Sequence, residues 1–195
     1  MENIVHSLIT VIIPSIGRPT LSKSLDSLIQ QNNSKWTACV GFDGCNPPQP
    51  LYDPRINYVY LKKVGDRKNY GGAVRNILFP LVMTDWMCFL DDDDTFKSDY
   101  IDSFANEVKN NPDADCIVFK MSYDFQNQKV LPSTYISEIK THFTGISFAV
   151  KKSFITQNSI LFENGPLENF FFLEKIQKNN GKIVFSKNIT YNVGF

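Results

Sequence analysis

A short apolar segment that ends in four consecutive aspartates constrains the fold more than any other stretch of this chain. Residues 86–90 read WMCFL, and Asp91, Asp92, Asp93 and Asp94 follow at once. An apolar run of this length, with large side chains throughout, is typical of a strand buried on both faces. Ligand sites in open α/β sheets lie beyond the carboxyl ends of such strands. The sequence therefore predicts a polar site at the end of a central strand.

The spacing of the four acids indicates a metal site. In an extended chain successive side chains alternate, so Asp91 and Asp93 are expected on one side and Asp92 and Asp94 on the other. Two carboxylates ~5 Å apart repel by roughly 3 kcal/mol at an effective dielectric of ~20, and a divalent cation removes that cost. Carboxylate oxygens without neighbouring Cys or His suit Mg²⁺ or Mn²⁺. We therefore expect Asp91 and Asp93 to bind such an ion.

Two other interpretations of the acidic run are less favourable. Runs of acids are often solvated loop charges, but here a buried strand leads directly into them. An EF-hand loop is excluded because Phe96 stands at its sixth position, where that loop needs Gly.

The rest of the chain alternates between strand-like and helix-like stretches. Apolar, β-branched runs predict strands, and apolar residues three and four apart predict helices. We expect Thr20 and Ser98 to cap two helices, and Arg75 to lie opposite the apolar face of a third. The expected strands cover residues 8–14, 36–44, 55–61, 86–90, 116–121 and 142–150, and the expected helices begin near residues 20, 72, 98 and 163. This alternation predicts an α/β fold with parallel strand pairing.

Composition narrows the class of protein. A chain of 195 residues with 43% hydrophobic content suits one domain with one core. Lys plus Arg equals Asp plus Glu at 20 each, which gives no basic excess for nucleic-acid binding. Cys39, Cys88 and Cys116 lie in apolar runs and Cys45 stands apart, which favours reduced thiols and a cytoplasmic location. Neither a signal peptide nor a transmembrane segment is expected.

Five motifs follow one another along the chain, and their order is more informative than any one of them. They are TVIIPSIGRP, GFDG, GGAVRN, FLDDDD and GPLENFF. In this order they resemble the GT-A type glycosyltransferases, in particular the large, mostly inverting family that builds cell-surface and secreted polysaccharides from nucleotide sugars. The resemblance covers nearly the whole chain. It implies a Rossmann-like, mostly parallel central sheet flanked by helices, with a small antiparallel second sheet toward the C-terminal part.

The resemblance also implies roles for individual residues. The loop with Pro14 and Arg18 would face the nucleotide, Asp43 would hydrogen-bond the base, and the backbone at Gly72 together with Arg75 would approach the nucleotide. Asp91 and Asp93 would form the metal-binding DXD motif. The residues expected to bind the donor are Pro14, Arg18, Asp43, Gly72, Arg75, Asp91 and Asp92, and the expected metal ligands are Asp91 and Asp93.

The catalytic base is where the chain departs from the family pattern. The family has Glu-Asp at the start of the last helix, with the Asp as base, whereas this chain has Glu168 and Asn169. An amide cannot take a proton from a hydroxyl at neutral pH, so Glu168 is the expected base. A first-turn acid favoured by the helix dipole is the alternative role for Glu168. Glu163 and Asp124 are the other candidates for the base.

The expected function is metal-dependent transfer of a sugar from a nucleoside diphosphate donor to a hydroxyl of a glycan or glycoprotein, with inversion. A UDP-sugar is the first expectation for the donor and a GDP-sugar the second. Residues 1–98 would bind the nucleotide and residues 99–195 the acceptor, and we keep open that the chain is one domain of a longer polypeptide. The alternatives are a sugar nucleotidyltransferase, although SIGRP offers a poor phosphate loop, and a catalytically degenerate binding module.

Overall fold

The computed structural model describes residues 7–46, 51–64, 71–123, 129–132, 139–141, 144–163 and 165–194. Nine strands in these residues form one sheet in the order β3-β2-β1-β4-β8-β6-β9-β5, with β7 beside β6. The strands are β1 (Ile9–Ser15), β2 (Trp36–Asp43), β3 (Ile56–Leu61), β4 (Trp86–Phe89), β5 (Thr95–Phe96), β6 (Cys116–Tyr123), β7 (Lys129–Leu131), β8 (Phe148–Lys151) and β9 (Ile183–Asn192). The helices are α1 (Leu21–Ile29), α2 (Gly72–Leu78), the 3₁₀ turn η1 (Phe79–Leu81), α3 (Tyr100–Asn110), α4 (Lys152–Gln157) and α5 (Glu168–Lys178).

The first half of the sheet is parallel. β1 pairs with β2 on one side and with β4 on the other, and β2 pairs with β3, all in parallel. Every residue of β1 is buried, which explains why its apolar residues occupy neighbouring positions instead of alternating with polar ones. Because the chain moves outward from β1 in both directions, the carboxyl ends of β1 and β4 form a switch point of the kind where α/β proteins bind ligands.

The antiparallel pairs lie in the second half of the sheet. β8 runs antiparallel to both β4 and β6, β7 runs antiparallel to β6, and β5 runs antiparallel to β9. β6 and β9 are parallel, with a register shift near Lys120. The α/β class is therefore confirmed, and the expected antiparallel part toward the C-terminus continues the same hydrogen-bonded sheet.

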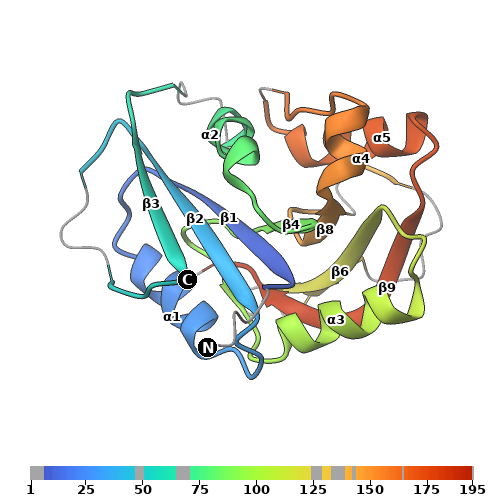
Figure 1. Ribbon diagram of the computed structural model, residues 1–195, viewed down its shortest axis with the longest axis horizontal. Helices are drawn as coiled ribbons and strands as arrows, with labels where there is room; N and C mark the ends of the chain where they lie inside the picture. The colour runs from blue at the N-terminus through green and yellow to red at the C-terminus, as the bar shows by residue number, and fades with distance from the viewer. Residues whose placement is uncertain are drawn as a thin grey trace, which may run out of the picture.

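Helices cover both faces of the sheet. In Figure 1, α1 and α3 lie on one side of the sheet, and α2, α4 and α5 lie on the other. Under α5 the ring of Phe89 from β4 meets the rings of Phe148, Phe162 and Phe172, with centroids 5.2, 5.1 and 6.0 Å away. This aromatic cluster anchors α5, and so the position of Glu168, to the strand that carries the acids.

Several predicted helix starts differ from the structure. α3 begins at Tyr100 rather than after Ser98, because residues 98 and 99 form a turn in which the Tyr100 amide bonds the Lys97 carbonyl at 3.1 Å. Thr20 does precede α1, but its hydroxyl makes no capping hydrogen bond. The predicted helix from residue 163 starts only at Glu168, because Gly165 has φ of +137° and Pro166 follows it.

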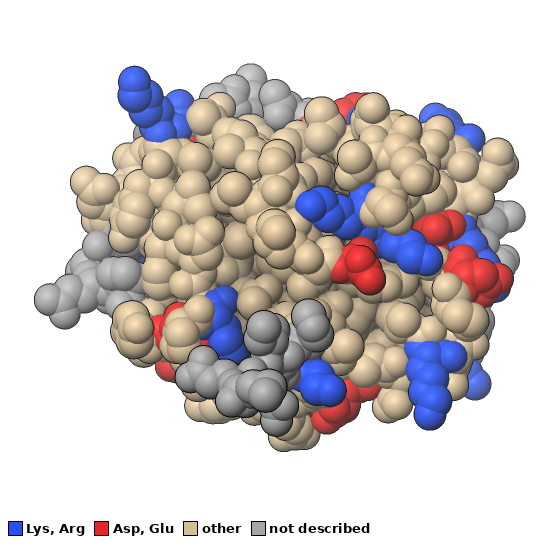
Figure 2. Space-filling model, in the orientation of Figure 1, with Lys and Arg blue, Asp and Glu red and all other residues tan. Residues whose placement is uncertain are grey.

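The thiols agree with the sequence interpretation. All four cysteines are unpaired, and Cys39, Cys88 and Cys116 are buried. The helices in the described part of the chain lack the length and the apolar content that a membrane-spanning helix needs. In Figure 2, charged residues of both signs lie mainly at the right and along the lower edge of the face, and a broad area at the upper left is mostly uncharged.

Candidate functional site

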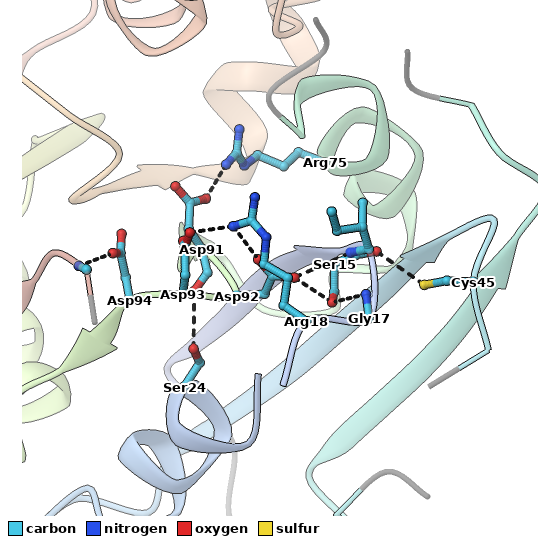
Figure 3. A network of polar contacts seen from close by, with 12 residues as sticks. Ser15, Gly17, Arg18, Ser24, Cys45, Arg75, Asp91, Asp92, Asp93 and Asp94 are labelled. Atoms are coloured by element: carbon cyan, nitrogen blue, oxygen red, sulfur yellow. Dashed lines mark hydrogen bonds and ion pairs between the residues drawn. The ribbon is translucent and has the colours of Figure 1, made fainter. Parts of the chain in front are cut away.

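Four segments meet at the carboxyl edge of β1 and β4. They are the loop after β1, the four aspartates after β4, the start of α2 and the start of α5. Figure 3 shows the aspartates between Arg75 on one side and Ser15 and Arg18 on the other. The structure thus brings together most of the residues that the sequence predicted for the site.

The four aspartates form a turn rather than an extended chain, and residues 91–94 are called the acid turn below. The Asp94 amide bonds the Asp91 carbonyl at 3.2 Å, and residues 92 and 93 are the turn residues. As a result, carboxylate oxygens of Asp91, Asp93 and Asp94 all lie within 4.8 Å of one another. The prediction that Asp94 points away with Asp92 is wrong, because a reverse turn brings its first and fourth residues together. Aspartate is itself a frequent turn residue, and this was the signal that could have indicated the turn.

Asp92 faces the loop after β1. It is buried, and it accepts hydrogen bonds from the Ser15 hydroxyl at 2.7 Å, the Ile16 amide at 3.3 Å and Arg18 at 3.2 Å. Burial raises the pKa of its carboxyl, which these bonds and Arg18 partly oppose. Asp92 therefore links the loop after β1 to the turn after β4. The contact of Asp92 with the nucleotide-sugar donor stays a prediction. Arg18 also pairs with Asp93 and is 46% exposed, so it reaches from the protein toward solvent.

Arg75 is buried, whereas we predicted it on the outer side of its helix. Its side chain is 1% exposed and forms ion pairs with Asp91 and with Glu168. The two carboxylates compensate the cost of burying the guanidinium. Because these partners come from other segments, the periodicity of the helix alone does not reveal that Arg75 is buried. The Asp91 side chain keeps 34% exposure, so it faces both Arg75 and the open side of the site.

Glu168 lies at the start of α5, as predicted, but it is nearly inaccessible. One oxygen pairs with Arg75, and the other accepts the Gly72 amide at 3.2 Å. Burial raises the pKa of Glu168 to about 7, although Arg75 pulls it down. Oδ1 of Asn169, next along the helix, is also buried and makes no hydrogen bond with the described residues.

The two glycines that open α2 permit close approach. Gly71 has φ of +95°, and a Cβ there would come 2.8 Å from Pro14 Cγ. A Cβ on Gly72 would come 2.7 Å from Oε2 of Glu168. Gly72 thus supports Glu168 directly, and Pro14 packs at the start of the same helix. Their expected contacts with the nucleotide stay predictions.

The remaining predicted residues lie around this centre. Asp43 ends β2, and its Oδ1 accepts the Val64 amide at 2.6 Å. Glu163 forms an ion pair of 2.8 Å with Lys175 and is half-exposed. Asp124, the other candidate for the base, lies outside the described residues.

Tyr191 is a site residue that the sequence analysis missed. It is fully buried near the end of β9, and its hydroxyl donates to Asp94 at 2.6 Å. Burial and the nearby Asp91 raise the pKa of Asp94 to about 7, while Tyr191 and the Gly194 amide lower it. A tyrosine in an alternating strand pattern carries no signal of a contact 97 residues away.

The acid cluster suits a hard divalent cation. Asp91, Asp93 and Asp94 offer only carboxylate oxygens, which is the ligand type that Mg²⁺ and Mn²⁺ prefer. Arg75 and Arg18 offset part of the negative charge. Within the described residues, this is the group of side chains that fits such an ion.

The sheet order and the acid turn define a GT-A fold, and comparison with solved structures supports this. The crystal structure of S. aureus TarS 1–349 matches with a TM-score of 0.78 at 18% identity, covering 96% of this chain and 60% of that one. The complex of TarS 1–349 with UDP-GlcNAc matches with a TM-score of 0.77 at 18% identity, over 95% and 58% of the two chains.

The sequence profile of Glycosyl transferase family 2 matches residues 10–171, so the chain belongs to that family. A protein of Haemophilus influenzae described as an uncharacterized glycosyltransferase is 24% identical over 183 residues, which is 87% of this chain and 62% of the relative. The chain thus spans less than two thirds of the length of that relative. The family resemblance expected from the motifs is confirmed.

Proposed function

We propose that this protein transfers a sugar from a nucleoside diphosphate donor to a hydroxyl of a glycan or glycoprotein, with inversion and with help from Mg²⁺ or Mn²⁺. Membership of glycosyl transferase family 2 supports the reaction class. The solved complexes of TarS with UDP-GlcNAc and with UDP support a UDP-sugar as the first candidate donor, with a GDP-sugar second. The observation that carries the proposal is the convergence of three carboxylates at the carboxyl edge of β4.

The acid turn is the proposed diphosphate end of the site. Asp91 and Asp93, with Asp94, would hold the ion, and the bound ion would act as a Lewis acid on the departing diphosphate. Arg18 is an exposed cation beside these acids, and we assign it to the diphosphate. Arg75 is buried, so its role is to balance the charge of Asp91 and hold it in place.

The nucleoside would lie along the ends of β1 and β2. Pro14 and Gly72 line the start of α2, and Asp43 ends the neighbouring strand. We propose that Asp43 accepts a hydrogen bond from the base. In this arrangement residues 1–98 bind the donor and residues 99–195 bind the acceptor.

Glu168 is the proposed proton acceptor. A carboxyl with a pKa of about 7 is well matched to removing a proton at neutral pH. Each oxygen of Glu168 accepts one hydrogen bond and keeps a second lone pair, so an acceptor hydroxyl need not displace Arg75 or the Gly72 amide. Because Glu168 is only 3% exposed, the groups that cover it must move to admit that hydroxyl. A movement that opens Glu168 to the acceptor is therefore part of the proposal.

A panel of donors tests the reaction class. Thermal stabilisation by UDP- and GDP-sugars is measured with and without Mn²⁺, because a ligand that binds the folded state raises the melting temperature. We expect stabilisation by one nucleotide class that depends on Mn²⁺ and is lost in Asp93→Asn. Stabilisation that is equal with and without Mn²⁺, in both proteins, would remove the metal from the proposal.

The variant Glu168→Gln tests the base. As proton acceptor, Glu168 supports kcat, and general-base help is worth typically ~10²–10⁴-fold. We expect that loss in kcat with unchanged donor affinity. A loss of donor affinity with little change in kcat would instead show that Glu168 acts through Arg75 on Asp91.

A second candidate is a binding module for nucleotide sugars that has lost its chemistry. Asn169 in place of an aspartate and the low exposure of Glu168 favour it. Slow release of UDP from a UDP-sugar by the purified protein separates the two candidates. A transferase leaks its donor to water, whereas a binding module leaves it intact.

A further inference from the structure

The buried hydroxyl of Tyr191 contacts two of the aspartates in the acid turn. It donates a hydrogen bond of 2.6 Å to Oδ2 of Asp94 and accepts one of 3.2 Å from the amide of Asp91. We infer that Tyr191 is a positioning residue, which holds Asp94 and the backbone of Asp91 in the geometry that binds a divalent cation. The inference rests on the proposed function and adds a residue from the far end of the chain to it.

The strand pairing leaves Tyr191 little freedom. β9 pairs with β5 so that Tyr191 lies opposite Phe96, and the Lys97 amide bonds the Thr190 carbonyl at 2.8 Å. The ring of Tyr191 packs edge-on against Phe96 with 5.5 Å between centroids. The hydroxyl is therefore placed by main-chain pairing that starts immediately after the acid turn.

Asp94 receives a donor on each oxygen. Tyr191 bonds Oδ2, and the Gly194 amide bonds Oδ1 at 2.7 Å. Two fixed donors set the plane of the carboxylate, as outer partners of metal-binding groups do.

Asp94 is then the buried member of the candidate metal cluster. It is 5% exposed, whereas the side chains of Asp91 and Asp93 are 34% and 44% exposed. Its oxygens lack the freedom that solvent allows the other two. Its alignment therefore depends on the two donors from the end of β9.

The test is Tyr191→Phe, which removes the hydroxyl and keeps the ring. Binding of MnCl₂ to the whole protein is measured by calorimetry, first alone and then with UDP. Loss of a partner that orients a metal-binding group typically weakens metal affinity ~10–100-fold. We expect a loss in that range, with the circular dichroism spectrum of the folded protein unchanged.

Tyr100→Phe is the matched control. Tyr100 is equally buried and stacks on Phe96 from α3, with 3.8 Å between centroids. Its hydroxyl bonds Cys88 rather than a carboxylate. Removing this hydroxyl changes core packing to a similar extent, and we expect Mn²⁺ affinity within about twofold of the unmodified protein, inside ordinary experimental scatter.

A double-mutant cycle tests whether Tyr191 acts through Asp94. If it does, adding Tyr191→Phe to Asp94→Asn costs little further Mn²⁺ affinity, because each change alone already removes the interaction between Tyr191 and Asp94. Full additivity, or an equal loss in Tyr100→Phe, would overturn the assignment. Should Tyr191→Phe not fold, Asp94→Asn is measured alone. Unchanged Mn²⁺ affinity in that variant would overturn the assignment, because Asp94 would then not be a metal ligand for Tyr191 to position.

Failure of the proposed function gives a different result. Absence of Mn²⁺ uptake by the unmodified protein would overturn both the metal proposal and the role of Tyr191. Normal uptake by the unmodified protein and by Tyr191→Phe alike would overturn the role of Tyr191 alone.

Discussion

Ser15 and Asp92 lie 77 residues apart in the sequence and share a buried hydrogen bond of 2.7 Å. Ser15 ends β1, and Asp92 follows β4, which pairs with β1 in parallel so that Ile12 lies opposite Phe89. The two strands therefore deliver their loops to the same edge. The bond locks the first loop onto the acid turn, and a substitution on either side of it tests that link.

Ser15→Ala should destabilise the protein by about 1–3 kcal/mol, because a buried carboxylate loses one of its donors. Urea denaturation measures the change. Ser22→Ala is the control, since its hydroxyl bonds the Pro19 carbonyl at the surface and its loss should cost under about 0.5 kcal/mol. Equal costs for the two variants would mean that the Ser15 bond adds nothing.

Gly72→Ala should displace Glu168, because the new Cβ would come 2.7 Å from Oε2. In an ordinary helix, alanine is favoured over glycine by roughly 1 kcal/mol. Here we expect the opposite sign in urea denaturation. A gain in stability would show that Glu168 does not lie against Gly72.

Arg75→Met should destabilise the protein by about 3–5 kcal/mol, since it leaves two carboxylates around a buried position without their cation. Adding Glu168→Gln should restore part of that loss. Lys182→Met, which breaks an exposed ion pair with Asp113, should change the stability little and serves as control. A comparable effect of both single changes in chemical denaturation would contradict the buried network.

Stability should fall as pH rises toward neutrality because of Glu168. Its pKa is raised from 4.5 to about 7 by burial, so the folded state holds the proton more tightly than the unfolded state. The contribution is complete below pH 4.5 and is lost as pH rises through about 7. Its size is roughly 3 kcal/mol, from 1.36 kcal/mol for each pH unit.

Denaturation of the metal-free protein at pH 5 and at pH 8 measures this. Glu168→Gln should show a smaller fall between the two pH values than the unmodified protein. An identical fall would assign the pH dependence to other groups, of which Asp94 is the first candidate because its pKa is also raised to about 7.

The sequence predicted the parts of the fold that depend on local pattern. The buried run of β1 and the apolar strand before Asp91 were identified from composition and length alone, and with them the edge that carries the site. Motif order then indicated the family. These features could be predicted because each depends on a short continuous stretch of the sequence.

The contacts that complete the site could not be predicted in this way. Arg75 lies in a helix whose pattern gave it an outer position, yet two acids from distant segments bury it. Asp94 joins the cluster through a reverse turn, and Tyr191 reaches it from a strand near the other end of the chain. Such pairings arise from tertiary packing, which periodicity does not encode.

The Gly194 amide that bonds Asp94 comes from a residue 100 positions later in the chain. Contacts of such long sequence separation form late, because a large loop must close before they contribute. The geometry proposed for the ion is therefore complete only when β9, the last strand, has joined the sheet.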